Sequence, residues 1–209
     1  MQYIQLNNGV AMPVLGFGVF QITDPHECEK SVLEAIDTGY RLIDTAASYE
    51  NEAAVGKAIK ESALQRNELF ITTKVWIHAN GYQNTLKSFE NSLMRLQIEY
   101  IDLYLMHQPY GDVYSTWRAM QELYKTGQVK AIGVCNFHTD RLMDLIVHNE
   151  IVPAVNQIET HPFHQQVETQ LFLQENNVQI ESWGPFAEGK NNIFQNELLL
   201  SIGKKYNKT

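Results

Sequence analysis

The stretch GYRLIDTAASYENEAAVGKAI, residues 39–59, decides the fold of this chain. A short, largely apolar run over residues 40–43 leads directly to Asp44, as in a buried strand. From Ala54 to Ile59 the apolar residues recur at helical spacing instead. Asp44 is therefore expected at the carboxyl end of a strand, with Tyr49 on the loop that follows. Polar side chains at that rim of a parallel barrel converge on a ligand, so Asp44 and Tyr49 are candidate site residues.

The composition limits the class of protein. With 209 residues, 44% of them hydrophobic, residues 1–209 can bury a core as one domain. A net charge of -8 argues against nucleic-acid partners and anionic membrane surfaces, which require clustered Lys and Arg. Cys28 and Cys135 have no metal-ligand spacing, and there is no apolar signal or long apolar run. These features predict a soluble, cytoplasmic protein.

A strand-helix unit repeats along most of the chain. Residues 3–6 and 10–12 flank the turn Asn7-Asn8-Gly9, which predicts an N-terminal β-hairpin. Strands are then expected at 15–20, 40–44, 69–75, 101–107, 129–134, 154–158 and 178–183, with helical patterns between them. This alternation predicts an α/β fold with parallel strands. A (β/α)₈ TIM-type barrel is favoured over an open doubly wound sheet.

The expected barrel lacks its last β/α unit. A helix beginning near Phe194 is expected to run to Thr209, and no eighth strand is predicted. Closure of the barrel therefore stays open. Without an eighth strand, Leu15–Phe20 and Val178–Trp183 would be sheet edges through which the chain could self-associate.

Polar residues end or follow several of the predicted strands. They are Asp44, Lys74, His107, Asn136, Gln157 and Glu159. An ammonium group near a phenol favours the phenolate, so Lys74 is expected to lower the pKa of Tyr49 and make it a general acid near neutral pH. His107 could orient a carbonyl oxygen. Taken singly, Asp44 and Lys74 are better explained as a structural ion pair and His107 as a core histidine. Their occurrence on successive strands favours a functional site.

Five motifs together carry a family resemblance. They are DTAASYENE (44–52), TTKVW (72–76), DLYLMHQP (102–109), IGVCNF (132–137) and VNQIETHP (155–162). The chain resembles the aldo-keto reductases, in particular small bacterial-type carbonyl reductases, over essentially its whole length. The resemblance implies a monomer that reduces small aldehydes or ketones with NADP(H). Asp44, Tyr49, Lys74 and His107 would match the catalytic tetrad, with Tyr49 as proton donor.

The same resemblance implies the ligand-binding residues. Asn136 and Gln157 would hold the nicotinamide carboxamide, together with Cys135, which stands where relatives usually carry Ser and offers only a weak thiol contact. Trp183 would stack on the nicotinamide ring. Cofactor binding is also expected from Gly184, Pro185 and Phe186, which begin a segment that could cover the pyrophosphate. An aromatic substrate pocket is expected from Phe20, Trp76 and Tyr110, although plain rim packing explains any one of them as well.

Other functions are less well supported by the sequence. His161 and His164 lack a supporting helix or a nearby Cys, so they are expected to be surface histidines, and no metal is predicted. One alternative is a truncated reductase-like chain with weak or no cofactor binding. Another is an aldolase-type barrel that uses Lys74 as a Schiff-base nucleophile. A neighbouring Asp44 should oppose imine formation, because it keeps the amine of Lys74 charged.

Overall fold

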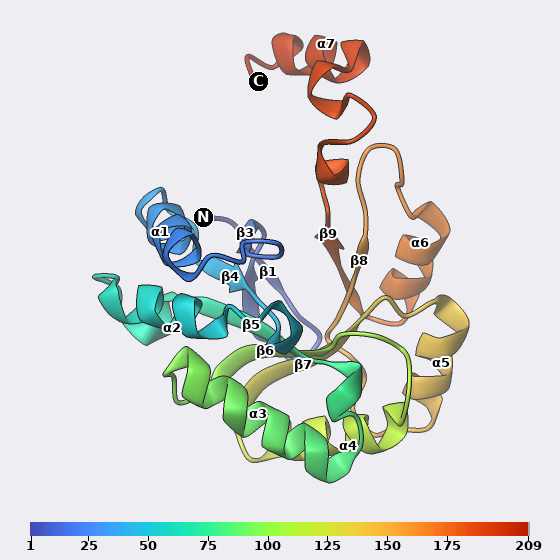
Figure 1. Cartoon of the computed structure of the whole chain (residues 1–209). Coiled ribbons are helices and arrows are strands. Elements are labelled where there is room, and N and C mark those ends of the chain that lie inside the picture. Colours follow the sequence, from blue (N-terminus) through green and yellow to red (C-terminus); the bar gives the residue numbers. More distant parts are fainter. Residues whose placement is uncertain (209) are drawn as a thin grey trace.

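The computed structural model describes residues 1–208 (Figure 1). The chain opens with two short antiparallel strands, β1 (Tyr3–Gln5) and β2 (Ala11–Pro13), in which Ile4 lies opposite Met12. The turn between them includes Gly9 at a φ of 84°. That left-handed conformation is readily available to glycine because it has no Cβ.

Seven parallel strands form the main sheet in chain order. They are β3 (Gly16–Gly18), β4 (Leu42–Asp44), β5 (Phe70–Val75), β6 (Ile101–Met106), β7 (Val129–Cys135), β8 (Val155–Glu159) and β9 (Gln179–Trp183). Every predicted strand is present, but β3 is shorter than the expected 15–20. Gly16 packs so closely on Leu42 that an added Cβ would lie 2.6 Å from a Leu42 methyl group. A side chain at this position would require the Leu42 side chain to move.

The helices follow the strands along the chain. They are α1 (Pro25–Asp37), α2 (Glu52–Glu61), α3 (Tyr82–Leu96), α4 (Val113–Lys125), α5 (Thr139–Val147), α6 (Val167–Glu175) and α7 (Glu197–Lys205). In Figure 1, α1 to α6 lie around the outside of the curved sheet. The start of α1 is fixed by Asp24, whose Oδ1 accepts a hydrogen bond of 2.8 Å from the backbone N–H of Glu27.

The two faces of the sheet bury different sets of side chains. On β6, Leu103 and Leu105 pack inside the curve of the sheet, whereas Tyr104 and Met106 pack outward in the core beneath the helices. This is the alternation expected of a strand covered on both faces. Met12 of the opening strand pair joins the inner cluster, so the pair contributes to the core inside the sheet.

Within residues 1–208 the sheet is open, with β3 and β9 as its two edges. The expected helix near Phe194 begins later, at Glu197, after a short 3₁₀ turn at Ile193–Gln195, and it ends at Lys205. Thr209, where this helix was expected to end, lies outside the described residues. Helix α7 stands away from the sheet in Figure 1 and fully buries none of its side chains. None of the helices in this described part is long and apolar enough to span a bilayer.

Candidate active site

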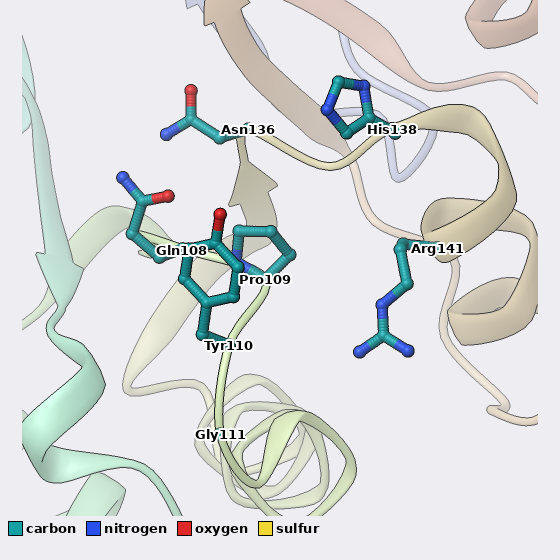
Figure 2. Close-up of a pocket in the computed structure, with 7 residues that line it drawn as sticks. All are labelled: Gln108, Pro109, Tyr110, Gly111, Asn136, His138 and Arg141. Carbon is teal, nitrogen blue, oxygen red and sulfur yellow. The ribbon is translucent and has the colours of Figure 1, made fainter.

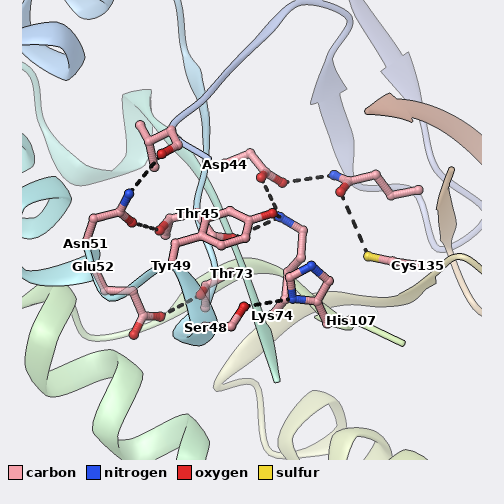
Figure 3. A network of polar contacts seen from close by, with 12 residues as sticks. Asp44, Thr45, Ser48, Tyr49, Asn51, Glu52, Thr73, Lys74, His107 and Cys135 are labelled. Atoms are coloured by element: carbon pink, nitrogen blue, oxygen red, sulfur yellow. Dashed lines mark hydrogen bonds and ion pairs between the residues drawn. The ribbon is translucent and has the colours of Figure 1, made fainter. Parts of the chain in front are cut away.

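Lys74 on β5 is the centre of a polar network inside the rim of the sheet (Figure 3). Its side chain is completely buried and forms an ion pair with Asp44, the last residue of β4. Its Nζ also donates to the backbone oxygen of Thr45 at 3.0 Å and to the Tyr49 hydroxyl at 3.5 Å. Burial lowers the pKa of Lys74, but the neighbouring acidic groups, with Asp44 as the strongest and Tyr49 and Cys135 adding to it, together outweigh this effect and leave the pKa above its ordinary value. The amine is therefore a charged ammonium group.

Tyr49 lies in a 3₁₀ turn, Ala47–Tyr49, with its hydroxyl group beside the amine of Lys74 (Figure 3). Its ring packs against Phe20 and His107, with centroid separations of 4.9 and 5.5 Å. The prediction that its pKa is lowered is wrong. Burial raises the pKa of Tyr49 above its ordinary value, Asp44 adds to the rise, and Lys74 offsets only part of it. The phenol therefore keeps its proton at neutral pH.

His107 directly follows β6 and faces the Tyr49 ring. Its Nδ1 lies 3.3 Å from the hydroxyl oxygen of Ser48, and its ring packs against Trp76 at 4.9 Å. Burial, together with the positive charge of Lys74, lowers the pKa of His107 to about 3. The imidazole is therefore neutral and can donate one hydrogen bond. Ser48 was missed by the sequence reasoning, since a serine in a turn has no pattern that marks it.

The residues expected on the cofactor side are joined to the same network. The side-chain amide of Asn136 donates to the backbone oxygen of His107 at 3.1 Å and accepts from Trp183 Nε1 at 2.8 Å. Gln157 donates to Oδ2 of Asp44 at 2.9 Å, while Cys135 makes only a weak thiol contact of 3.9 Å to Gln157 Oε1. Burial raises the pKa of the Cys135 thiol, which keeps it neutral.

Glu181 is a second residue that the sequence reasoning missed. It lies on β9 opposite Gln157, and its Oε2 is buried without a hydrogen-bond partner. Burial, reinforced by the nearby charge of Asp44, raises the pKa of Glu181 to about 8. A period of two along β9 places Glu181 on the same face as Trp183, and this alternation could have identified it.

The remaining predicted residues lie at the periphery. Phe20 and Trp76 contact the network through Tyr49 and His107, as described above. Tyr110 is 64% exposed and lines a cavity beside Asn136 (Figure 2). Gly184, Pro185 and Phe186 follow β9, and the exposed Phe186 ring packs on Phe194 at 5.8 Å.

The two histidines of the expected surface pair differ in exposure. His164 is exposed as predicted, but the prediction is wrong for His161, whose side chain is only 8% exposed. The reason is that His161 packs against Phe163 and contacts Glu159 at 3.3 Å. Across residues 1–208, His, Cys, Asp and Glu side chains form no cluster of three or more that could hold a metal ion.

Comparison with known proteins identifies the family. The sequence model described as the Aldo/keto reductase family matches residues 14–197. The chain belongs to this family. It is similar to the glyoxal reductase of Bacillus subtilis (strain 168), with 48% identity over 207 residues that cover 99% of this chain and 74% of the relative.

Solved aldo/keto reductases have the same fold. A structure from Brucella melitensis matches with a TM-score of 0.94 at 42% identity, covering 100% of this chain and 80% of the other. A Bombyx mori aldo-keto reductase in complex with NADP matches with a TM-score of 0.93 at 31% identity, covering 100% of this chain and 76% of the Bombyx chain. The chain is an oxidoreductase of the small bacterial type, and its curved parallel sheet is that of its aldo/keto reductase relatives.

Proposed function

We propose that this chain reduces small aldehydes or ketones to alcohols with NADP(H), using Tyr49 as the proton donor. The observation that carries the proposal is the convergence of Asp44, Tyr49, Lys74 and His107 at one rim of the sheet. Glyoxal reduction by the Bacillus relative and the NADP complex of the Bombyx relative support the substrate class and the cofactor.

The proton chemistry follows from the charges in the network. Tyr49 is neutral and can give its hydroxyl proton to the oxygen of a carbonyl substrate. The ammonium group of Lys74, 3.5 Å from that hydroxyl, stabilises the phenolate that remains. The neutral His107 donates a hydrogen bond to the same oxygen and orients the carbonyl group. Asp44 keeps Lys74 in place and charged.

The residues on the cofactor side fit a nicotinamide group. A carboxamide needs one hydrogen-bond acceptor and one donor from the protein. Gln157 Oε1 can be the acceptor, because it accepts only a weak hydrogen bond from the Cys135 thiol. The side-chain amide of Asn136 can be the donor, because it has a second N–H besides the one that bonds to the backbone oxygen of His107. Trp183 offers an indole face, and Gly184, Pro185 and Phe186 would cover the adjoining phosphates. When bound, the cofactor supplies the hydride to the carbonyl carbon. We assign NADP(H) rather than NAD(H) from the Bombyx complex.

The aldolase alternative is opposed by the surroundings of Lys74. Imine formation requires a neutral amine that a substrate can reach. Lys74 is fully buried, paired with Asp44, and has its pKa raised. Borohydride treatment in the presence of a carbonyl compound should therefore leave the mass of the protein unchanged.

Oxidation of NADPH in the presence of glyoxal, methylglyoxal and simple aldehydes tests the proposal. We expect NADPH consumption that depends on the carbonyl compound and yields the matching alcohol. Calorimetric titration with NADPH and with NADH measures the cofactor preference separately. A chain that binds neither nucleotide and consumes none would instead be the reductase-like protein without activity.

A further inference from the structure

Asn51 stands at the N-cap position of α2, yet its side chain does not cap that helix. Asparagine and aspartate at this position ordinarily accept a hydrogen bond from a backbone N–H of the first helical turn, as Asp24 does at α1 and Asn196 at α7. Asn51 is only 4% exposed and makes three hydrogen bonds in other directions (Figure 3). Its side chain therefore serves contacts outside its own helix.

Two of these hydrogen bonds hold the turn formed by residues 19–22. Asn51 Nδ2 donates to the backbone oxygen of Val19 at 2.9 Å and to that of Ile22 at 3.2 Å, so it binds both ends of the turn. Gln21, the third residue of the turn, has a φ of 69°, a left-handed conformation that favours glycine. The same turn carries Phe20, whose ring packs on Tyr49. The amide of Asn51 thus stabilises a turn that its own sequence strains.

The third hydrogen bond reaches the residue that receives the Lys74 amine. Asn51 Oδ1 accepts from the hydroxyl group of Thr45 at 2.7 Å, and Thr45 is completely buried. The backbone N–H of Thr45 donates to the backbone oxygen of Thr72 at 3.0 Å, while its backbone oxygen accepts from Lys74 Nζ at 3.0 Å. Asn51 therefore helps to fix one of the acceptors that place the ammonium group beside the Tyr49 hydroxyl.

The position of Asn51 is itself fixed by the next residue, Glu52. The side chain of Glu52 is completely buried, and its Oε1 accepts from the hydroxyl group of Thr73 at 2.6 Å. Its Oε2 accepts from Arg95 Nε at 2.7 Å. The start of α2 is thereby joined to β5, one residue before Lys74, and to α3. Asn51 holds the turn and Thr45 from a rigid base.

We propose that Asn51 is a positioning residue of the active site, which holds the turn carrying Phe20 and the backbone oxygen that receives Lys74 in one arrangement around Tyr49. The inference rests on the proposed function and adds a residue to its machinery. The contact with the turn acts on substrate binding, because Phe20 lies against Tyr49 on the side expected to face the carbonyl compound. The contact with Thr45 acts on kcat, because stabilisation of the phenolate depends on where the ammonium group lies.

The kinetic test separates these two contacts. Asn51→Leu removes both at similar side-chain volume, whereas Thr45→Val removes only the bond between Thr45 and Asn51 and keeps the backbone oxygen. Asn149→Leu is the control, because this partly buried asparagine donates to the backbone oxygen of Leu145 in α5. With NADPH and glyoxal, we expect Asn51→Leu to lower kcat by about 10- to 100-fold, the cost of a slightly misplaced group, and to raise KM. Thr45→Val should lower kcat with KM nearly unchanged.

Gln21→Gly provides a rescue that a general loss of stability would not allow. Glycine adopts the positive φ without the two bonds from Asn51. Adding Gln21→Gly to Asn51→Leu should therefore restore KM to near that of the parent and leave kcat low, because the bond to Thr45 is still missing.

Hydrogen exchange of backbone amides provides a readout that does not require turnover. The N–H of Val19 donates to the backbone oxygen of Asp44 at 3.0 Å, and that of Ile22 to the backbone oxygen of Val19 at 3.2 Å. We expect Asn51→Leu to speed exchange over residues 19–22 by about fivefold or more, the size expected for the loss of one hydrogen bond, with β6 unchanged. This result in a chain that reduces no carbonyl compound would mean that the proposed function has failed and the positioning has not.

Three results would overturn the inference. The first is that Asn51→Leu changes kcat, KM and exchange no more than Asn149→Leu does. The second is that exchange rises equally in residues 19–22 and in β6, and the third is that Gln21→Gly fails to restore KM. If Asn51→Leu does not fold, Thr45→Val decides, since a kcat equal to that of the parent would also overturn the inference.

Discussion

Gln157 and Asp44, 113 residues apart in the chain, are joined by a hydrogen bond of 2.9 Å. Asp44 accepts this bond on Oδ2 and the ion pair from Lys74 on Oδ1. The residue expected to hold the nicotinamide carboxamide therefore shares a carboxylate with the group that supports Tyr49. Nicotinamide binding at Gln157 and proton transfer at Tyr49 would therefore both depend on the side chain of Asp44.

Tyr49→Phe should reduce turnover of a small aldehyde by about 10² or more, because general acid catalysis contributes 10² to 10⁴. Nicotinamide binding should be retained, since the change removes one oxygen atom from the ring. Steady-state NADPH oxidation and calorimetric NADPH titration measure the two properties. Tyr206→Phe, at an exposed position in the last turn of the described chain, is the control. Turnover near that of the parent in folded Tyr49→Phe would contradict the assignment of the proton donor.

Trp183→Ala should weaken NADPH binding, because the nicotinamide ring would lose an aromatic face. Trp183→Phe retains an aromatic face and loses only the hydrogen bond to Asn136, so it should bind more tightly than Trp183→Ala. Calorimetric titration is the suitable measurement, because both substitutions change the tryptophan fluorescence. Equal affinities of both variants and the parent would show that Trp183 is not the stacking residue.

Lys74→Met should destabilise the folded protein by about 3 to 5 kcal/mol, because it leaves Asp44 without its charged partner in a largely buried site. Combining it with Asp44→Asn should recover much of this loss, since the uncompensated charge is then gone. Denaturant unfolding gives the free energies. Lys57→Met is the control, because its ion pair with Glu29 involves an exposed lysine and should matter little. Additive effects of the two core substitutions would refute the coupling.

Glu181 should make stability fall as the pH rises. Its pKa increases from 4.5 in the unfolded chain to about 8 in the folded protein, so the folded state binds more protons between these values. The free energy of unfolding should therefore decrease from about pH 4.5 to pH 8, and Glu181→Gln should remove that slope. Denaturant unfolding across this range measures it. A slope that is the same in both proteins would show that Glu181 does not titrate as described.

His107 should have the opposite effect at acidic pH. Its pKa falls from 6.5 to about 3 on folding, so the unfolded chain binds more protons between these values. The stability contributed by the neutral imidazole is complete above pH 6.5 and is lost as the pH falls toward 3. His107→Gln should flatten the stability profile that denaturant unfolding gives over this range.

The sequence predicted the fold well because its patterns are local. The changes of period around Asp44, Lys74 and His107 correctly place these residues at strand ends, and all the predicted strands and helices are present. Element ends are predicted less well, since β3 is Gly16–Gly18 rather than 15–20 and β4 is Leu42–Asp44 rather than 40–44. The single-domain organisation of residues 1–209 and self-association through the edges at β3 and β9 stay predictions.

The electrostatics of the site could not be derived from spacing. The pattern identified a lysine near Tyr49, but the sign of the pKa shift depends on how completely the phenol is buried. Ser48 and Glu181 were missed for a related reason, because their roles come from contacts with residues on other strands. The pKa of Tyr49 and the contacts of Ser48 and Glu181 are both determined by three-dimensional packing.

The strands of the sheet follow the order of the chain, and this has a consequence for how such proteins diversify. The groups that handle the proton come from β4, β5 and β6 with their loops, whereas those assigned to the nicotinamide come from β7, β8 and β9. A genetic crossover between His107 and Cys135 would exchange one set as a block and leave the other intact. Two side-chain hydrogen bonds of the site span that boundary, Gln157 to Asp44 and Asn136 to the backbone of His107, and a viable chimera has to preserve both, together with the pairing of β6 with β7.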